Sequence, residues 1–286
     1  YEFWFYYLSI AKEKNIPTIL ASALFRKGQI FFQFYGGFYK KILNLFTAIL
    51  VQDEASLDLI KPIISNSKIS ITGDTRFDRV ISTASTVTKF EWIQKLSHNK
   101  IIIAGSTWEN DHIVLAKAAS HLEKFNWIIV PHHVDPISIA ECRSHFPKAI
   151  TLSELHNSKQ HFTLPTIIIV DQIGLLRSLY QYSFISYVGG GFGKDGVHNV
   201  LEPAAFGKPV IWGNNDNKYR EAIGLRNAGG GFAVQNAEAL LQQIQLLLAA
   251  EKDYSKVCSL SAQYIIEHAG ATNKTIEFLN EQHFLN

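Results

Sequence analysis

Short runs of apolar residues recur along the chain and alternate with stretches whose apolar residues are spaced as in a helix. The runs are rich in Ile and Val and lack the alternation of a half-exposed strand, so they predict strands buried on both faces. Such strands, alternating with helices, are typical of a parallel sheet covered by helices, and the predicted fold class is therefore α/β. The predicted strands are Pro17–Ala21, Phe46–Gln52, Lys68–Gly73, Lys100–Gly105, Trp127–Pro131, Thr166–Asp171, Phe184–Gly189 and Pro209–Gly213.

The helical patterns and the Ser/Thr-rich stretches indicate how the chain is divided. Helical spacing is clear in Asn110–Lys124 and dominates Ala237–Leu285. Between Asp78 and Asn99 the chain is rich in Ser and Thr and has no strand pattern, which predicts a domain boundary. The first part has three predicted strands, about half of a doubly wound domain, so we expect it to be incomplete. The predicted parts are a first Rossmann-like domain in 1–84, a linker in 85–98, a second Rossmann-like domain in 99–270 and a C-terminal helix in 271–286.

The segment Gln29–Leu50 has an apolar side in helical projection. Most apolar stripes belong to the core, so the pattern favours a core-facing amphipathic helix, interrupted near Gly36 and Gly37. The alternative is a surface that contacts a membrane or lipid chains. The apolar side consists of Phe31, Phe34, Tyr35, Phe38, Ile42, Leu45, Phe46 and Ile49.

Composition excludes several classes of protein. With 286 residues, 47% of them hydrophobic, the chain is typical of globular rather than disordered proteins. Its 27 Lys and Arg against 25 Asp and Glu give a net charge of +2, too balanced for binding to nucleic acid driven by bulk charge. Two cysteines, Cys142 and Cys258, cannot form a disulfide framework or a four-ligand zinc site, which predicts an intracellular protein. No run reaches the ~18 apolar residues of a membrane-spanning helix.

The most informative segment is a Gly-rich loop that follows a predicted strand. After Val188 come Gly189, Gly190 and Gly191, and a helix is predicted to start near Asn199. Glycines permit positive φ and the close approach of a ligand, and the N–H groups at a helix start can hold a phosphate. Glu202 offers carboxylate oxygens suited to a pair of ribose hydroxyls, or it is simply a first-turn carboxylate that complements the helix dipole.

Other predicted strands also end in polar residues. Ser106 and Thr107 follow one strand and either cap the next helix, with Glu109 closing a capping box, or bind a phosphate. His132 and His133 follow the next strand and suit a phosphate contact better than a metal, since no further ligands stand at useful spacing. Asp135 is best interpreted as a helix N-cap, whereas Asp171 after a later strand is either a cap or a ligand contact.

Taken in order, these segments resemble the 3-deoxy-D-manno-octulosonic acid (Kdo) transferases. The donor-site signature of that family resembles Gly189–Phe192, His198–Ala205 and Gly207–Ile211. Supporting matches are Glu2–Trp4, Val51–Glu54, Gly73–Asp78, Ala104–Glu109, Pro131–His133 and Asp171–Gly174. One departure is Pro131-His132-His133, where the family commonly has Pro-Arg-His.

The resemblance implies a GT-B fold, with two Rossmann-like domains facing a cleft. It implies an inverting, metal-independent transfer of Kdo from CMP-Kdo to a lipid A precursor, without a cofactor, at the cytoplasmic face of the bacterial inner membrane. The enzyme would be peripheral or singly anchored there. The implied substrate-binding residues are Glu2, Ser106, Thr107, His132, His133, Gly189, Gly190, Gly191, His198, Asn199 and Glu202.

The resemblance also places the general base of the family in a Gly-Glu segment near the start of the first domain. The chain has no Met and begins with Tyr1 in an apolar segment, so we expect that the base precedes Tyr1 and that this piece alone is inactive. Two alternatives stay open. One is another GT-B enzyme that uses a UDP-sugar, and the other is a relative that binds a nucleotide sugar without catalysis.

Overall fold

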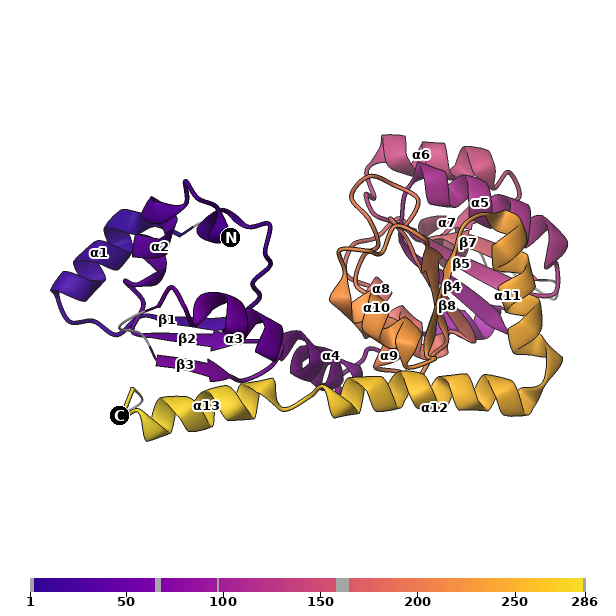
Figure 1. Ribbon diagram of the computed structural model, residues 1–286. Coiled ribbons are helices and arrows are strands. Elements are labelled where there is room, and N and C mark those ends of the chain that lie inside the picture. Colours follow the sequence, from indigo (N-terminus) through magenta and orange to yellow (C-terminus); the bar gives the residue numbers. More distant parts are fainter. Residues whose placement is uncertain (1–2, 65–67, 97, 158–164, 285–286) are drawn as a thin grey trace. The chain divides into compact units, whose positions relative to one another are not determined.

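The chain divides into two α/β units. The computed structural model describes residues 3–64, 68–96, 98–157 and 165–284 (Figure 1). The first unit comprises 1–79 and 268–286, and the second comprises 80–267. The division falls within α4 (Thr75–Ser85). Glu2 lies outside the described residues.

The first unit is a three-stranded parallel sheet in the order β1-β2-β3. The central strand is fully buried, whereas the two outer strands are partly exposed because no other strand among the described residues pairs with their outer edges. The strands are β1 (Ile19–Ala23), β2 (Ala48–Val51) and β3 (Lys68–Ile71). The helices are α1 (Phe5–Glu13), η1 (Ile30–Phe32), α2 (Gly37–Leu43), α3 (Glu54–Ile60) and α13 (Ala271–Glu281).

The second unit is a seven-stranded sheet in the order β10-β9-β8-β4-β5-β7-β6, with every pair parallel. Its strands are β4 (Ile101–Thr107), β5 (Asn126–Pro131), β6 (Ile150–Thr151), β7 (Ile167–Ile169), β8 (Ile185–Val188), β9 (Val210–Gly213) and β10 (Gly231–Val234). Its helices are η2 (Glu91–Lys95), α5 (Glu109–His121), α6 (Pro136–His145), α7 (Leu152–Asn157), α8 (Leu176–Leu179), η3 (Tyr180–Tyr182), α9 (Leu201–Ala204), α10 (Arg220–Asn227), α11 (Ala237–Ala249) and α12 (Glu251–Glu267).

Alternate residues of each central strand enter two separate cores, one on each face of the large sheet. From β4, Ile102 and Ala104 pack with residues of α5, α6 and α11. Ile101 and Ile103 point to the other face and pack with residues of α7 and η3. Because both faces are covered, strands such as β5 and β8 are buried along their whole length, which is why their sequences are apolar without alternation.

Within the described ranges the structure contains all the predicted strands and two more, β6 and β10. Residues 85–98, predicted to be a linker, instead place Trp92 and Leu96 in one core of the second unit. The C-terminal helix α13 belongs to the first unit, where Lys68 of β3 donates a hydrogen bond to Gln282.

The helix predicted over Gln29–Leu50 is wrong in extent. The segment forms η1, α2 and β2, and α2 begins at Gly37, the position predicted for the interruption. Because the chain changes direction, the residues of the predicted apolar side separate. Phe31, Ile42, Phe46 and Ile49 are buried, whereas Phe34, Tyr35 and Phe38 are exposed.

Candidate functional site

Three of the polar strand ends meet at one edge of the large sheet. Strands β5 and β8 are the two neighbours of β4, and all three are parallel, so the loops after them leave from the same edge. The chain builds outward from β4 through β5 in one direction and later returns to β8 on the other side. This reversal of strand order is the place where open α/β sheets bind ligands.

Aromatic rings from these three loops form a stack. The His132 ring lies face to face with Trp108, with centroids 4.5 Å apart, and with His198, with centroids 4.6 Å apart. His133 meets Trp108 edge-on at 5.1 Å. The indole Nε1–H of Trp108 donates to Nε2 of His198 over 2.8 Å. Both His132 and His133 are exposed to solvent, so the stack is open to a ligand.

The surroundings favour neutral imidazoles in this stack. Partial burial, followed by the neighbouring His198 and His133, lowers the pKa of His132. Burial also lowers the pKa of His198, against the opposing effect of the carboxylates of Asp111 and Asp195.

The Gly-rich loop packs so tightly that side chains are excluded. A Cβ on Gly189 would lie 2.3 Å from the carbonyl oxygen of Ser106, and one on Gly191 would lie 2.4 Å from that of Gly213. Gly190 has a φ of +90°, and a Cβ there would be 2.3 Å from the oxygen of Gly196. The loop therefore needs glycine for close backbone approach and, at Gly190, for its left-handed conformation.

The N–H groups of Gly189 and Gly190 are engaged within the protein. Gly189 donates to the carbonyl oxygen of Gly105 over 2.9 Å, and Gly190 donates to Oδ2 of Asp111 over 2.8 Å. The expectation that this loop offers its N–H groups to a phosphate therefore does not extend to these two. Instead, the two bonds fix the loop against the ends of β4 and α5.

Asp111, which sequence reasoning did not select, organises the site. Its buried carboxylate accepts from the Tyr187 hydroxyl over 2.6 Å, from the N–H of Trp108 over 2.9 Å and from that of Gly190 over 2.8 Å. Trp108 is the N-cap of α5 and Asp111 is its third residue, so neither Ser106 nor Thr107 caps this helix and Glu109 closes no capping box. The available signal was an acidic residue three positions after the true N-cap.

Ser106 and Thr107 occupy an irregular strand end. Ser106 has a φ of +53°, which is strained for a residue other than glycine, and the pairing with β5 shifts register there. The Thr107 hydroxyl is buried and contacts Nε2 of His112 at 2.9 Å. Nδ1 of His112 in turn lies 3.0 Å from the carboxylate of Glu141. The Thr107 hydroxyl therefore belongs to a chain of hydrogen bonds that runs through His112 to Glu141.

Asn199 lies two residues before α9, a helix of one turn whose N-cap is Val200, and Glu202 is the second residue of that helix. The side-chain oxygen of Asn199 accepts from the N–H of Leu201 over 3.1 Å, and its amide donates to Glu202 over 3.2 Å. A helix of 4 residues has a small dipole, so the expected anion site at its start loses most of its physical basis. The side chain of Asn199, which follows His198 in the sequence, is exposed, and that of Glu202 is half-buried.

Two further motifs have structural partners. Asp135 caps α6 through bonds from Ile137 and Ser138, as predicted. In the first unit, Asp78 of the Gly73–Asp78 motif accepts from the N–H groups of Gly270 and Thr272, each over 2.6 Å, and so caps α13.

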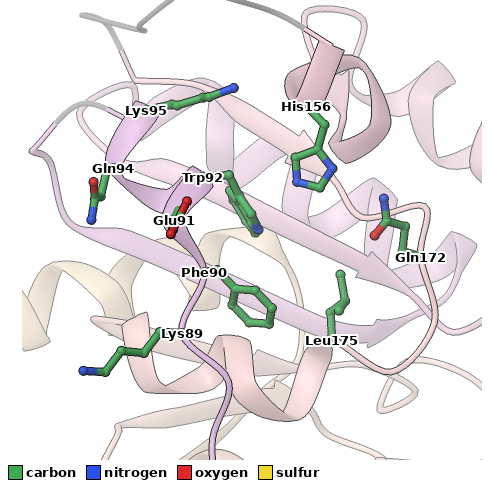
Figure 2. Close-up of a pocket in the computed structure, with 9 residues that line it drawn as sticks. All are labelled: Lys89, Phe90, Glu91, Trp92, Gln94, Lys95, His156, Gln172 and Leu175. Carbon is green, nitrogen blue, oxygen red and sulfur yellow. The ribbon is translucent and has the colours of Figure 1, made fainter.

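A cavity of about 570 Å³ lies elsewhere in the second unit (Figure 2). Figure 2 shows Phe90, Trp92 and Leu175 lining it together with polar side chains. None of the predicted site residues that the structure describes lines it. We place the candidate site at the ring stack because three loops meet there at the reversal of strand order. The lining residues of the cavity are Lys89, Phe90, Glu91, Trp92, Gln94, Lys95, His156, Gln172 and Leu175.

One group of side chains in the described ranges has the composition of a metal site. Ligand atoms of Glu109, Glu141 and His145 lie within 4.8 Å of one another. Glu141 already contacts both His112 and His145 at 3.0 Å, so two members of the group, Glu141 and His145, are paired with each other. No predicted site residue belongs to it.

Comparison with known proteins agrees with the motifs. A sequence profile described as 3-deoxy-D-manno-octulosonic-acid transferase (kdotransferase) matches residues 1–79. The 3-deoxy-D-manno-octulosonic acid transferase of Chlamydia trachomatis is 28% identical over 246 residues, which cover 82% of this chain and 55% of that protein. The Aquifex aeolicus enzyme of the same name is 31% identical over 161 residues, covering 54% and 43%. A bifunctional glycosyltransferase/methyltransferase of Fusobacterium nucleatum is 28% identical over 259 residues, covering 86% and 39%.

Solved structures with low sequence identity show the fold. A UDP-N-acetylglucosamine 2-epimerase has a TM-score of 0.66 at 16% identity, over 98% of this chain and 70% of that one. A glycosyltransferase from Rickettsia africae has a TM-score of 0.53 at 17% identity, over 96% and 78%. The predicted α/β fold of GT-B type, built from Rossmann-like units, is therefore confirmed.

The chain spans 39 to 55% of the length of the three curated proteins. In the described residues, no helix is both long and apolar enough to cross a membrane. The resemblance first seen in the motifs is supported by the profile over residues 1–79 and by the curated proteins: this chain is similar to the 3-deoxy-D-manno-octulosonic acid transferases.

Proposed function

We propose that this chain is part of a glycosyltransferase that moves Kdo from CMP-Kdo to a lipid A precursor. The observation that carries the proposal is the similarity to a curated Kdo transferase over 82% of the chain, with the motifs after β4, β5 and β8 gathered at one edge of the large sheet. The second unit would hold the nucleotide end of the donor at Ser106, the ring stack, the Gly-rich loop, Asn199 and Glu202. Glu2 in the first unit would meet the sugar or the acceptor.

In the proposed reaction, the bond between the anomeric carbon of Kdo and the phosphate breaks, and negative charge develops on CMP. Fixed N–H donors placed where that charge develops lower the barrier. The exposed imidazoles of His132 and His133 are suited to this role, whereas the N–H groups of Gly189 and Gly190 hold the loop in place. The transfer is proposed to invert the anomeric centre and to need no metal. We assign no described residue to the role of general base for the acceptor hydroxyl.

An exposed aromatic surface of the first unit supports a lipid acceptor and a membrane partner. Phe34 is 97% exposed, and the rings of Phe5 and Phe38 meet at 5.1 Å, which joins α1 to α2. Aromatic side chains of this kind favour the interface between lipid and water. We propose that this surface works at the cytoplasmic face of the inner membrane. Its exposed members are Trp4, Tyr6, Tyr7, Phe34, Tyr35, Phe38 and Tyr39.

Calorimetric titration of the chain with CMP and with UDP tests the proposal. We expect CMP to bind more tightly than UDP, since the donor of a Kdo transferase carries cytidine monophosphate. Tighter binding of UDP would favour a GT-B enzyme that uses a UDP-sugar. Binding of CMP by a full-length protein that transfers no Kdo to a lipid A precursor would favour a non-catalytic relative.

A further inference from the structure

The hydrogen bond between Trp108 and His198 fixes where a proton can enter the ring stack. An indole N–H only donates, so Nε2 of His198 must be the acceptor and carry no hydrogen. The neutral tautomer of His198 therefore has its hydrogen on Nδ1. Protonation of His198 would place a second N–H against the indole N–H and break this bond.

His132 has no such restriction. Its ring lies over the hydrogen-bonded pair of Trp108 and His198, with centroids 4.5 Å from Trp108 and 4.6 Å from His198, and it is exposed to solvent. A protonated His132 would therefore lie over the face of an indole, an arrangement that favours a cation. Two positive charges 4.6 Å apart repel, so His132 and His198 do not both become charged.

The charged and titratable groups around the stack are consistent with the uptake of a single proton. His198 and His133 face His132, and the carboxylates of Asp111 on α5 and Asp195 in the Gly-rich loop face His198. Asp111 already accepts three hydrogen bonds. An anion that binds at the exposed side of the stack would supply the negative charge that stabilises a protonated His132.

We propose that the stack of Trp108, His132 and His198 is a phosphate site that binds its anion together with one proton, taken up by His132. The inference rests on the proposed function only in naming the phosphate of a cytidine nucleotide as the anion. Its physical content is that His198 is held neutral by Trp108 while His132 changes charge on binding.

The proposal sets the direction of the pH dependence. Uptake of a proton on binding means that the dissociation constant rises with pH, by at most about tenfold per pH unit. The rise occurs above the pKa of His132 in the free protein, which lies below its ordinary value, and ends at the higher pKa of the complex.

Calorimetry in buffers of different ionisation enthalpy counts the protons taken up. CMP and sulfate are both titrated into the chain, because the phosphate of CMP itself titrates near pH 6 whereas sulfate has no group that does. We expect uptake of up to one proton with either anion, loss of uptake in His132→Gln, and unchanged uptake in His121→Gln, an exposed histidine of α5 outside the site. Thermal unfolding of each variant confirms that it is folded.

A double variant separates the two histidines. Trp108→Phe keeps a ring in the stack but removes the N–H that holds His198 neutral, so Trp108→Phe/His132→Gln should regain uptake through His198. Uptake that persists in His132→Gln, or anion binding without any uptake, would overturn the proposal, as would the failure of both anions to bind. Sulfate binding with uptake but no CMP binding would instead contradict the proposed function and leave this inference standing.

Discussion

Replacement of Asp111 tests how the Gly-rich loop is held in place. In the Asp111→Ala variant, the Tyr187 hydroxyl and the N–H groups of Trp108 and Gly190 lose their common acceptor. A buried donor left without a partner costs about 1–3 kcal/mol, so three of them cost about 3 kcal/mol even at the low end of that range. We therefore expect the free energy of unfolding to fall by about 3 kcal/mol or more.

Two milder variants should rank below Asp111→Ala. Asp111→Asn can keep one oxygen on the two N–H groups while its amide faces Tyr187, and Tyr187→Phe removes a single bond to the carboxylate. Each is expected to cost about 1–3 kcal/mol. Glu109→Gln is the matched control, because it changes an exposed carboxylate in the same turn of α5 and should stay within about 0.5 kcal/mol of the wild type.

Urea unfolding measures these differences, and calorimetry with CMP measures the effect on the site. Displacement of Gly190 in Asp111→Ala should raise the dissociation constant for CMP by about tenfold, equivalent to 1.4 kcal/mol. An Asp111→Ala protein as stable as the Glu109→Gln control would refute the reasoning, since it would mean that the buried carboxylate holds nothing in place.

Three further predictions concern a helix cap, the ribose and the loop. Asp78→Asn should lower the stability by about 0.5–2 kcal/mol at neutral pH. Burial raises the pKa of Asp78, but the hydrogen bonds from Gly270 and Thr272 lower it, and the net effect is a lowered pKa. The contribution of Asp78 to stability should therefore be lost when urea unfolding is repeated below about pH 4. A difference in stability between the wild type and Asp78→Asn that persists there would contradict this role. Glu202→Ala should weaken CMP binding by about 1–3 kcal/mol in calorimetry, whereas a loss of stability with unchanged affinity would make Glu202 structural. Gly190→Ala should lower the free energy of unfolding by at least about 1–3 kcal/mol, through backbone strain and a steric clash. In thermal unfolding, Gly193→Ala should be clearly less destabilising, because its Cβ would lie 3.3 Å from its nearest neighbour.

The strands were predictable because burial on both faces leaves a continuous apolar run. β6 has only 2 residues, Ile150 and Thr151, and β10 begins directly after paired glycines, so neither gives such a run. The single helix predicted over Gln29–Leu50 was wrong for a different reason. Helical projection assumes one continuous axis, whereas this segment turns from a short helix into a buried strand.

The site was predictable where it depends on local sequence. The Gly-rich loop and the polar residues at strand ends follow from the chain itself, and parallel pairing brings them together. The bond between Trp108 and His198 joins residues 90 positions apart, so only the folded sheet reveals it. Asp111 was missed because the N-cap of α5 is Trp108, two residues beyond Ser106, which moves the reciprocal carboxylate from Glu109 to Asp111.

Hydrogen–deuterium exchange in the presence and absence of CMP tests most directly whether the nucleotide binds at the ring stack. We predict that CMP slows exchange in residues 106–111 and 189–199. Protection confined to residues 89–95 and 172–175, around the cavity of Figure 2, or no protection at all, would contradict the assignment.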